Sequence, residues 1–162
     1  MAAQPNLREV RFDLEIRIER PVEAVFAYVT DIRNLPQWQE SAEAADWIVE
    51  GSRFRERRSF LGRAAELELE VTAFELDRRF DVKVVTGPVK FEIRHRFEPV
   101  DSDTRVHVSA EAAIGGALRF AAGMAKRQAE RQFRADLQRL KEVLERRDEE
   151  SPSDRPPRLA DE

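Results

Sequence analysis

The chain has 162 residues, of which 41% are hydrophobic and 37% are charged, and it carries a formal net charge of −4 at pH 7. These values predict a single globular domain with a sizeable core, and the lack of net positive charge argues against nucleic-acid binding. No stretch approaches the roughly 20 apolar residues that span a bilayer, so we expect a cytoplasmic protein without stable membrane insertion. The chain has no cysteine and two histidines, so we expect no disulfide, no metal and no cofactor.

The first elements follow from residue periodicity. Residues 8–19 alternate between apolar and polar side chains, which is typical of a half-buried strand. Pro21 suits the first turn of a helix, and residues 21–32 place apolar side chains at helical spacing. A second short helix is expected in residues 34–41, where Trp38 would anchor it to the core.

From residue 46 onward, the pattern predicts six strands separated by short turns, and therefore an antiparallel meander. The residues expected to face inward from these strands are Trp47 and Val49; Phe54 and Phe60; Leu67, Leu69 and Val71; Phe80, Val82 and Val84; Val89, Phe91, Ile93 and Phe97; and Val106, Val108 and Ala110. A turn at residues 100–103 would place Phe97 opposite Val106 and would turn His95 inward.

After Gly115 and Gly116 the period becomes helical through about Arg146, which predicts a helix of roughly 30 residues and about 45 Å. Its inner stripe is small in the N-terminal half and bulky in the C-terminal half, and comprises Leu118, Ala122, Ala125, Ala129, Phe133, Leu137, Leu140 and Leu144. The small residues fit a cavity, but they equally fit close packing of the helix on the sheet. Residues 1–7 are expected to form an N-terminal arm, and residues 147–162 a disordered, charged and proline-rich tail.

The order of one strand, two short helices, six antiparallel strands and a long helix is the plan of the α+β helix-grip fold. The segments that carry this resemblance are IERPVEAVFAYVTDIRNLPQW (18–38), GSRFRERRSFLGRAAELELEVTAFE (51–75), GPVKFEIRHRFEPV (87–100) and LQRLKEVLE (137–145). Residues 8–146 thus resemble the START-like superfamily called SRPBCC, in its polyketide cyclase/dehydrase-like group. The resemblance implies a curved seven-stranded sheet wrapped around the long helix. It also implies an apolar pocket between them for lipids, isoprenoids, polyketides or aromatic compounds, and we expect a monomer or a homodimer.

One polar residue interrupts the apolar row of residues 89–97, and it is His95. Its ordinary pKa near 6.5 suits a group that orients a ligand carbonyl or carries a proton, so His95 is the candidate for catalysis. The alternative is a core histidine bonded to a neighbouring group. Glu56 and Arg58 share the inward side of their strand if alternation is strict, and there they could bind a polar headgroup. A bulge or a solvated strand end would place them differently.

The ligand-binding residues expected from these patterns are His95, Phe54, Leu69, Val82, Phe91, Ile93, Val106, Val108, Glu56 and Arg58. No nucleophile elbow, phosphate-binding loop, dinucleotide fingerprint or zinc-protease motif is present in the sequence. We therefore expect binding or transport of a hydrophobic small molecule. Two alternatives stay open: a polyketide cyclase/dehydrase-like enzyme in which His95 assists enolisation with an unidentified carboxylate, and an interaction protein similar to coenzyme Q-binding chaperones.

Overall fold

The structure is a computed structural model that describes residues 7–60 and 62–150, without the side chains of residues 60, 117, 118 and 148–150. Its elements are β1 (Arg8–Ile18), α1 (Val22–Thr30), the 3₁₀ helix η1 (Ile32–Asn34), α2 (Leu35–Trp38), β2 (Ala42–Val49), β3 (Arg53–Phe60), β4 (Arg63–Glu75), β5 (Arg79–Thr86), β6 (Phe91–Val100), β7 (Asp103–Ile114), the 3₁₀ helix η2 (Gly116–Ala121) and α3 (Ala122–Glu150).

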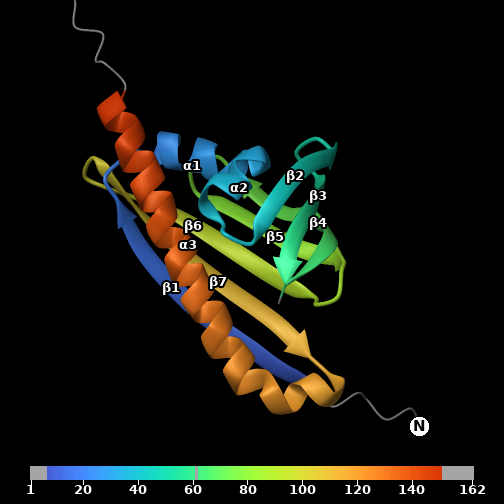
Figure 1. Ribbon diagram of the computed structural model, residues 1–162. Helices are drawn as coiled ribbons and strands as arrows, with labels where there is room; N and C mark the ends of the chain where they lie inside the picture. Colours follow the sequence, from blue (N-terminus) through green and yellow to red (C-terminus); the bar gives the residue numbers. More distant parts are fainter. Residues whose placement is uncertain (1–6, 61, 151–162) are drawn as a thin grey trace, which may run out of the picture.

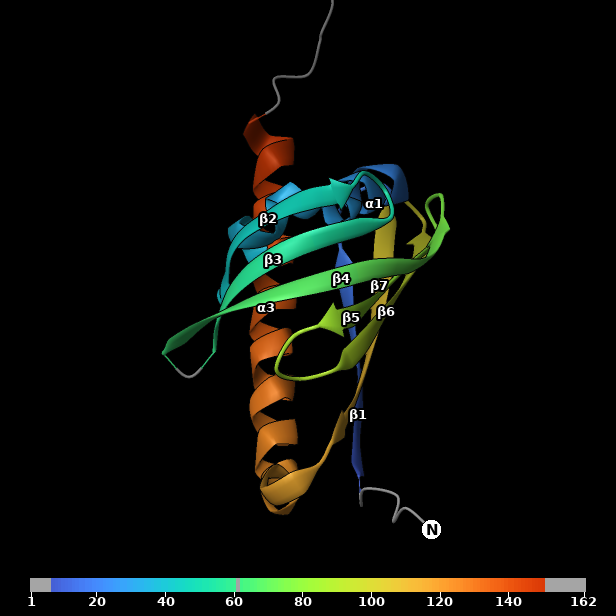
Figure 2. The same cartoon turned by 90° about the vertical axis from the view of Figure 1, so that its right-hand side faces the viewer.

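The seven strands form one antiparallel sheet in the order β1-β7-β6-β5-β4-β3-β2. The sheet bends strongly, so that β1 and β7 run along α3 whereas β2, β3 and β4 cross it (Figures 1 and 2). The short helices α1 and α2 close one end of this bent sheet beside the C-terminal half of α3 (Figure 1). The expected helix-grip architecture is confirmed.

The register of the last hairpin agrees with the sequence prediction. Phe97 pairs with Val106, and His95 pairs with Val108. The turn between the strands contains Asp101 with φ of 56°, a left-handed conformation that aspartate tolerates better than most residues. His95 is therefore held on the concave face of the sheet, toward α3.

Two predicted details of the strands are wrong. Val49 does not face the core but is 55% exposed, because the pairing of β2 with β3 shifts between Trp47 and Val49 and changes the alternation. Trp47 still packs edge-on against Phe54, with ring centroids 5.6 Å apart. Val89 lies in the loop before β6 and not in a strand.

The long helix also differs at its ends. It begins with the 3₁₀ turn η2 and continues to Glu150, so residues 147–150 are helical and do not belong to the expected tail. The rest of the predicted tail, residues 151–162, and residues 1–6 of the predicted arm lie outside the described residues. Within the described segments, no helix is long and apolar enough to cross a membrane.

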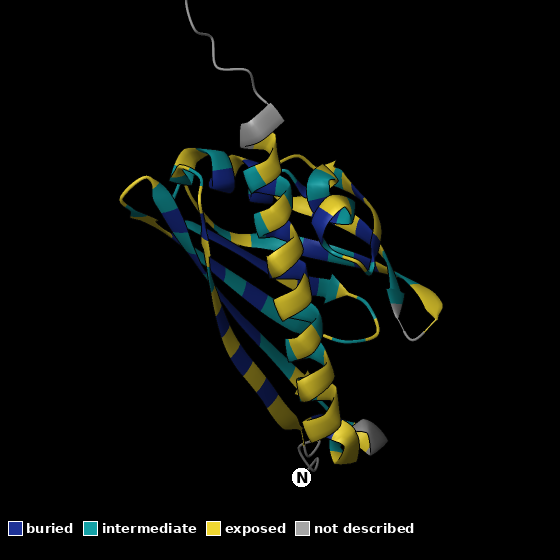
Figure 3. Ribbon diagram, turned by 60° about the vertical axis from the view of Figure 1, so that its left-hand side comes forward, coloured by how far each residue is buried: buried dark blue, intermediate teal, exposed yellow. Residues whose placement is uncertain are grey.

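Burial along α3 follows its predicted inner stripe, except that Ala125 is exposed. The C-terminal half carries the buried Leu137, Leu140 and Leu144, which belong to the core, and α3 contacts β1 and α2. In the N-terminal half, Ala122 is buried and Ala129 half-buried, and Ala125 is exposed. Figure 3 shows the outer face of α3 as largely exposed along its length. The core is thus filled at the α1 end, and the alanines leave room at the other end.

Candidate functional site

A cavity of about 230 Å³ lies between the N-terminal half of α3 and the concave face of the sheet. Its apolar wall consists of Val10, Phe12, Trp38, Val89, Phe91, Ile93, Val108, Ala110, Ala112, Ile114, Ala125, Ala129, Phe133 and Leu137. The polar residues that line it are Gln39, Arg58, His95, Glu111, Gln132 and Asp136. Phe133 of α3 packs edge-on against Phe12 of β1, with ring centroids 5.1 Å apart, and this contact helps to fix α3 over the sheet.

A second, smaller hollow of about 30 Å³ adjoins the first. The two share Trp38, Gln39, Arg58, Phe91, Ile93 and His95 in their walls. The smaller hollow reaches further under the part of the sheet formed by β3, β4 and β5, through Phe54, Leu69 and Val82. The two hollows are therefore separated by a shared set of side chains.

The structure brings nine of the ten residues predicted for the site to one or other of these hollows. The main cavity is lined by His95, Phe91, Ile93, Val108 and Arg58. The smaller hollow is lined in addition by Phe54, Leu69, Val82 and Glu56. Val106 lines neither hollow, and it lies in the core beside Phe97, its partner in the β6–β7 pairing.

One ring nitrogen of His95 forms a hydrogen bond within the protein, and the residue also lines the cavity. Its Nδ1 is 2.9 Å from the backbone oxygen of Phe80, across the β5–β6 pairing. The imidazole also packs against the rings of Phe80 and Phe97, at centroid distances of 5.9 and 6.4 Å. Both interpretations of this histidine thus hold in part, since a backbone group satisfies one nitrogen while the residue lines the cavity.

The chemistry of these contacts fixes the state of the imidazole. Because a carbonyl oxygen only accepts hydrogen bonds, Nδ1 must carry the proton. Burial lowers the pKa of His95, even though the bond to Phe80 acts in the opposite direction, and a neutral ring is favoured. Nε2 then has a free lone pair, and it has no hydrogen-bond partner among the residues described. His95 therefore offers the cavity a hydrogen-bond acceptor and a proton acceptor.

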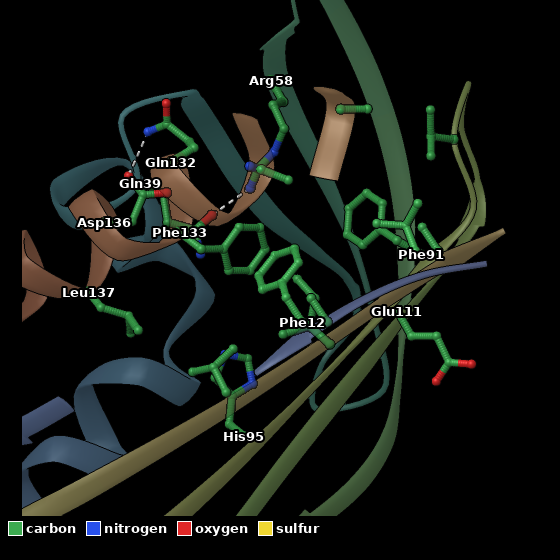
Figure 4. A pocket seen from close by; sticks show the side chains of 18 of the residues that line it. Phe12, Gln39, Arg58, Phe91, His95, Glu111, Gln132, Phe133, Asp136 and Leu137 are labelled. Atoms are coloured by element: carbon green, nitrogen blue, oxygen red, sulfur yellow. Dashed lines mark hydrogen bonds between the residues drawn. The ribbon is translucent and has the colours of Figure 1, made fainter. Parts of the chain in front are cut away.

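Strict alternation in β3 turns Glu56 and Arg58 inward, as the sequence predicts, because β3 and β4 pair without a register shift. The Glu56 carboxylate is 2% exposed and accepts a hydrogen bond from the Arg58 guanidinium. Arg58 also donates to Gln39 Oε1 and, at 2.8 Å, to Ser41 Oγ. Figure 4 shows the bond between Arg58 and Gln39 at the wall of the pocket. The cation is thus neutralised by a buried carboxylate and held by two further acceptors.

Two buried donors in this wall have no acceptor. Trp38 Nε1 and Arg58 Nε are each inaccessible to solvent and have no hydrogen-bond partner among the described residues. A buried donor without a partner costs about 1–3 kcal/mol, so two such groups in the lining of one cavity are unusual. Both belong to residues that line the main cavity and the smaller hollow.

Four polar residues of the site were not predicted from the sequence: Gln39, Glu111, Gln132 and Asp136, of which Asp136 is the most buried acid. Asp136 comes from the inner face of α3, is 6% exposed, and accepts hydrogen bonds from Gln132 Nε2 at 3.0 Å and the Glu40 backbone N–H at 3.2 Å. Burial raises the pKa of its carboxyl above the ordinary value. In the sequence, Asp136 lies three residues after Phe133 and four before Leu140. This helical spacing places an acid on the apolar face of the helix, and it is the feature from which Asp136 could have been predicted.

The polar residues are not spread evenly around the cavity. Arg58, Gln39, Gln132 and Asp136 lie on one side, and His95 lies on another (Figure 4). Glu111 sits at the rim and accepts a 3.4 Å hydrogen bond from Arg94 on the outer face. No cluster of three or more histidine or carboxylate side chains suited to a metal ion occurs within residues 7–60 and 62–150.

Comparison with known proteins agrees with this geometry. The family model described as polyketide cyclase/dehydrase and lipid transport matches residues 9–145. No protein with a curated description matches the chain in sequence.

Solved structures share the fold at low sequence identity. The Zhui aromatase/cyclase from Streptomyces sp. R1128 superposes with a TM-score of 0.76 at 16% identity, covering 86% of this chain and 96% of its own. A START superfamily protein from Mycobacterium smegmatis superposes with a TM-score of 0.72 at 17% identity, and the match covers 85% of this chain and 98% of that protein. A protein from Thermus thermophilus superposes with a TM-score of 0.67 at 20% identity, and the match covers 90% of this chain and 100% of that protein. With a family model that spans almost the whole described domain, the chain belongs to the polyketide cyclase/dehydrase and lipid transport family.

Proposed function

We propose that this protein binds a hydrophobic small molecule in the cavity between α3 and the sheet. The observation that carries the proposal is a cavity of about 230 Å³ whose wall is mainly apolar and contains few polar groups, as in small-molecule sites generally. Ala125 and Ala129 supply part of the helix side of this wall, where larger side chains would occupy the space. Membership of a family described by cyclases, dehydrases and lipid transport supports the same function.

The size and charge of the cavity restrict the class of compound that it can bind. Its volume is somewhat below the roughly 300–1,000 Å³ typical of pockets for drug-sized molecules, which favours a compact ring system or a short isoprenoid over a long acyl chain. The Arg58 charge is already balanced by Glu56, which favours a neutral ligand over an anion. A hydroxyl group could donate to His95 Nε2, and a carbonyl could accept from the guanidinium of Arg58, which lines the cavity.

Native mass spectrometry tests this function directly. The intact protein, purified without detergent, is compared with its mass under denaturing conditions, and we expect the native form to carry an additional small molecule. A panel of neutral phenols, naphthols, short isoprenoid quinones and fatty acids is then screened by thermal shift. A bound compound at 100 times its dissociation constant adds about 2.7 kcal/mol to the free energy of unfolding. No retained compound, together with no shift from any panel member, would refute the binding function.

A second candidate function is catalysis of ring closure and dehydration on a poly-β-ketone. The observation in its favour is that a neutral histidine, an arginine and a carboxyl with a raised pKa line one cavity. His95 Nε2 would remove a proton from the carbon between two carbonyl groups, and Arg58 would donate to the enolate oxygen. The enolate carbon then attacks another carbonyl of the same chain, forming a carbon–carbon bond. The alkoxide that forms takes back the proton from His95. His95 Nε2 would then remove the second proton of the attacking carbon while protonated Asp136 donates to the hydroxyl, which leaves as water as a carbon–carbon double bond forms. The Asp136 carboxylate would regain its proton from the imidazolium of His95.

This second function has its own test. The protein is incubated with a short poly-β-ketone thioester, and cyclised aromatic products are measured by liquid chromatography against the uncatalysed reaction. His95→Gln should abolish any acceleration while retaining ligand-induced thermal stabilisation, because glutamine keeps a donor for Phe80 but cannot take up the proton. Equal product with the wild type, His95→Gln and no protein would leave binding as the whole function.

A further inference from the structure

The first turns of the long helix place exposed apolar and cationic side chains together. Phe120 and Met124 are the two most exposed large hydrophobic residues described, at 79% and 77%. They lie where η2 passes into α3, and the Arg119 guanidinium stacks on the Phe120 ring at 4.7 Å. A pair of apolar side chains in water at this site is unfavourable unless another surface covers it.

Arginines continue this surface along the outer face of α3. Met124, Arg127, Arg131 and Arg134 follow at spacings of three and four residues, so they share one helix face over about 15 Å. Arg127, Arg131 and Arg134 are exposed, and none of them takes part in an ion pair within the described segments. We call Phe120, Met124, Arg127, Arg131 and Arg134 the helix stripe. Figure 3 shows this face of α3 open to solvent.

The local charge of this segment is opposite to that of the chain. From Arg119 to Arg134 there are five basic residues and one acidic residue, Glu130, which pairs with Lys126 at 4.0 Å. The chain as a whole carries a net charge of −4. On the outer face of the sheet, by contrast, Arg105 is matched by Glu15 and Glu98. The positive charge of the stripe is therefore both concentrated and unmatched.

We propose that the helix stripe docks the protein on an anionic phospholipid bilayer, with Phe120 and Met124 inserted at the level of the headgroups. Basic residues around exposed aromatic and aliphatic side chains are the pattern of segments that lie in the membrane interface. A polyanion such as nucleic acid would pair with the arginines but would leave Met124 in water. A second copy of the chain would bring arginines against arginines.

The position of the cavity supports the same orientation. Val89 in the loop before β6, Ile114 at the end of β7 and Ala125 in the first turn of α3 all line it. The end of β7 and the first turn of α3 lie at the end of the molecule that carries η2, where Phe120 and Met124 are exposed (Figures 1 and 2). Docking through the stripe would bring this end of the cavity next to lipid. The docking itself does not depend on which compound the cavity holds.

Vesicle co-sedimentation tests the proposal with the full-length protein. Vesicles of phosphatidylcholine with about 30% phosphatidylglycerol are compared with pure phosphatidylcholine at about 0.05 M and 0.5 M NaCl. We expect binding to the anionic vesicles at low salt, with weaker binding at high salt and to neutral vesicles. Each basic residue near such a surface contributes about fivefold to partitioning, so Arg127→Glu/Arg131→Glu should weaken binding by at least about 25-fold. Phe120→Ser/Met124→Ser should weaken binding that persists at high salt.

The matched control is Arg53→Glu/Arg63→Glu, which changes the net charge equally through exposed arginines on β3 and β4. It should retain at least half of the wild-type partitioning, and circular dichroism should show that all variants are folded. Absence of binding to anionic vesicles at low salt would overturn the proposal. An equal loss of vesicle binding in the control variant would also overturn it. So would binding to heparin by a protein that does not bind the vesicles. Loss of ligand in the mass-spectrometric test with vesicle binding intact would refute the cavity function alone.

Discussion

The Nδ1–H of His95 donates to the backbone oxygen of Phe80 at 2.9 Å, and the two nitrogens of the imidazole therefore have different roles. One nitrogen joins neighbouring strands of the sheet, and the other remains a lone pair beside the cavity. Because the ring is buried, its protonation would leave a charge in an apolar wall. The same residue should therefore link the stability of the domain to pH.

We predict that stability decreases as the pH falls below about 6.5 because of His95. In the unfolded chain the imidazole takes up a proton near its ordinary pKa of about 6.5, whereas burial lowers the pKa in the folded state. The stabilising contribution is then complete above about pH 6.5 and is lost as the pH falls toward the folded-state pKa, at up to about 1.4 kcal/mol per pH unit. Urea unfolding of the wild type and His95→Gln between about pH 5 and 8 measures the difference.

The comparison between variants isolates this group. Asp136 has a raised pKa and acts in the opposite direction, but it is present in both proteins and cancels in the difference. The control is His107→Gln, on the exposed outer face opposite Arg96. Because His107→Gln retains His95, this variant should lose stability at low pH as the wild type does. An unchanged pH profile in His95→Gln would contradict the assignment.

Removing the cation of the buried pair should cost far more than removing an exposed one. Arg58→Met leaves the Glu56 carboxylate, which is 2% exposed, without its partner, and we expect a loss of about 3–5 kcal/mol. Glu56→Gln/Arg58→Met should recover most of this loss, because no charge remains buried. The adjacent Arg57 pairs with Glu43 at 3.1 Å on the exposed side, so Arg57→Met should cost under about 1 kcal/mol. Chemical denaturation of the wild type and these variants gives the values, and equal costs for Arg58→Met and the double variant would exclude a penalty from the buried charge.

The sheet could be predicted from the sequence because each strand buries one face, and burial leaves a period of two in the residues. The same reasoning turned His95 inward, and it turned Glu56 and Arg58 inward on the condition that β3 alternates strictly, which its regular pairing with β4 fulfils. It failed at Val49, where a register shift breaks the period without leaving a glycine or proline as a signal. A local pattern thus predicts the direction of a side chain only while pairing is regular.

The polar side of the cavity was harder to predict, because it depends on contacts between distant segments. Asp136 is held by the backbone of Glu40, 96 residues away, and this contact brings α3 to the turn before β2. The sequence showed an acid among leucines but not its partner. Likewise, the small residues Ala125 and Ala129 fitted both a cavity and close packing, and the choice between them depends on the curvature of the whole sheet.

Filling the cavity should abolish ligand binding without unfolding the domain. Ala129→Phe places a ring in existing space, so we expect an unchanged or slightly raised melting temperature together with loss of the thermal shift caused by a panel ligand. Ala135→Phe is the control, since Ala135 is exposed on the same helix and outside the cavity wall. It should bind ligand as the wild type does. Full binding by Ala129→Phe would show that the ligand occupies another site.

The filled and hollow parts of the domain should also respond differently to the same truncation on one helix. Leu140 is 1% exposed in the core, whereas Leu137 is 4% exposed but lines the cavity. Leu140→Ala removes contacts on every side, and its cost should lie near the upper end of the roughly 2–5 kcal/mol typical of such changes. Leu137→Ala should lie near the lower end, because part of its surface already borders empty space, and the enlarged cavity should admit ligands with an additional ring substituent. Chemical denaturation and thermal shifts with a homologous ligand series measure the two effects. A greater loss of stability in Leu137→Ala than in Leu140→Ala would mean that the space beside Leu137 is closed in solution.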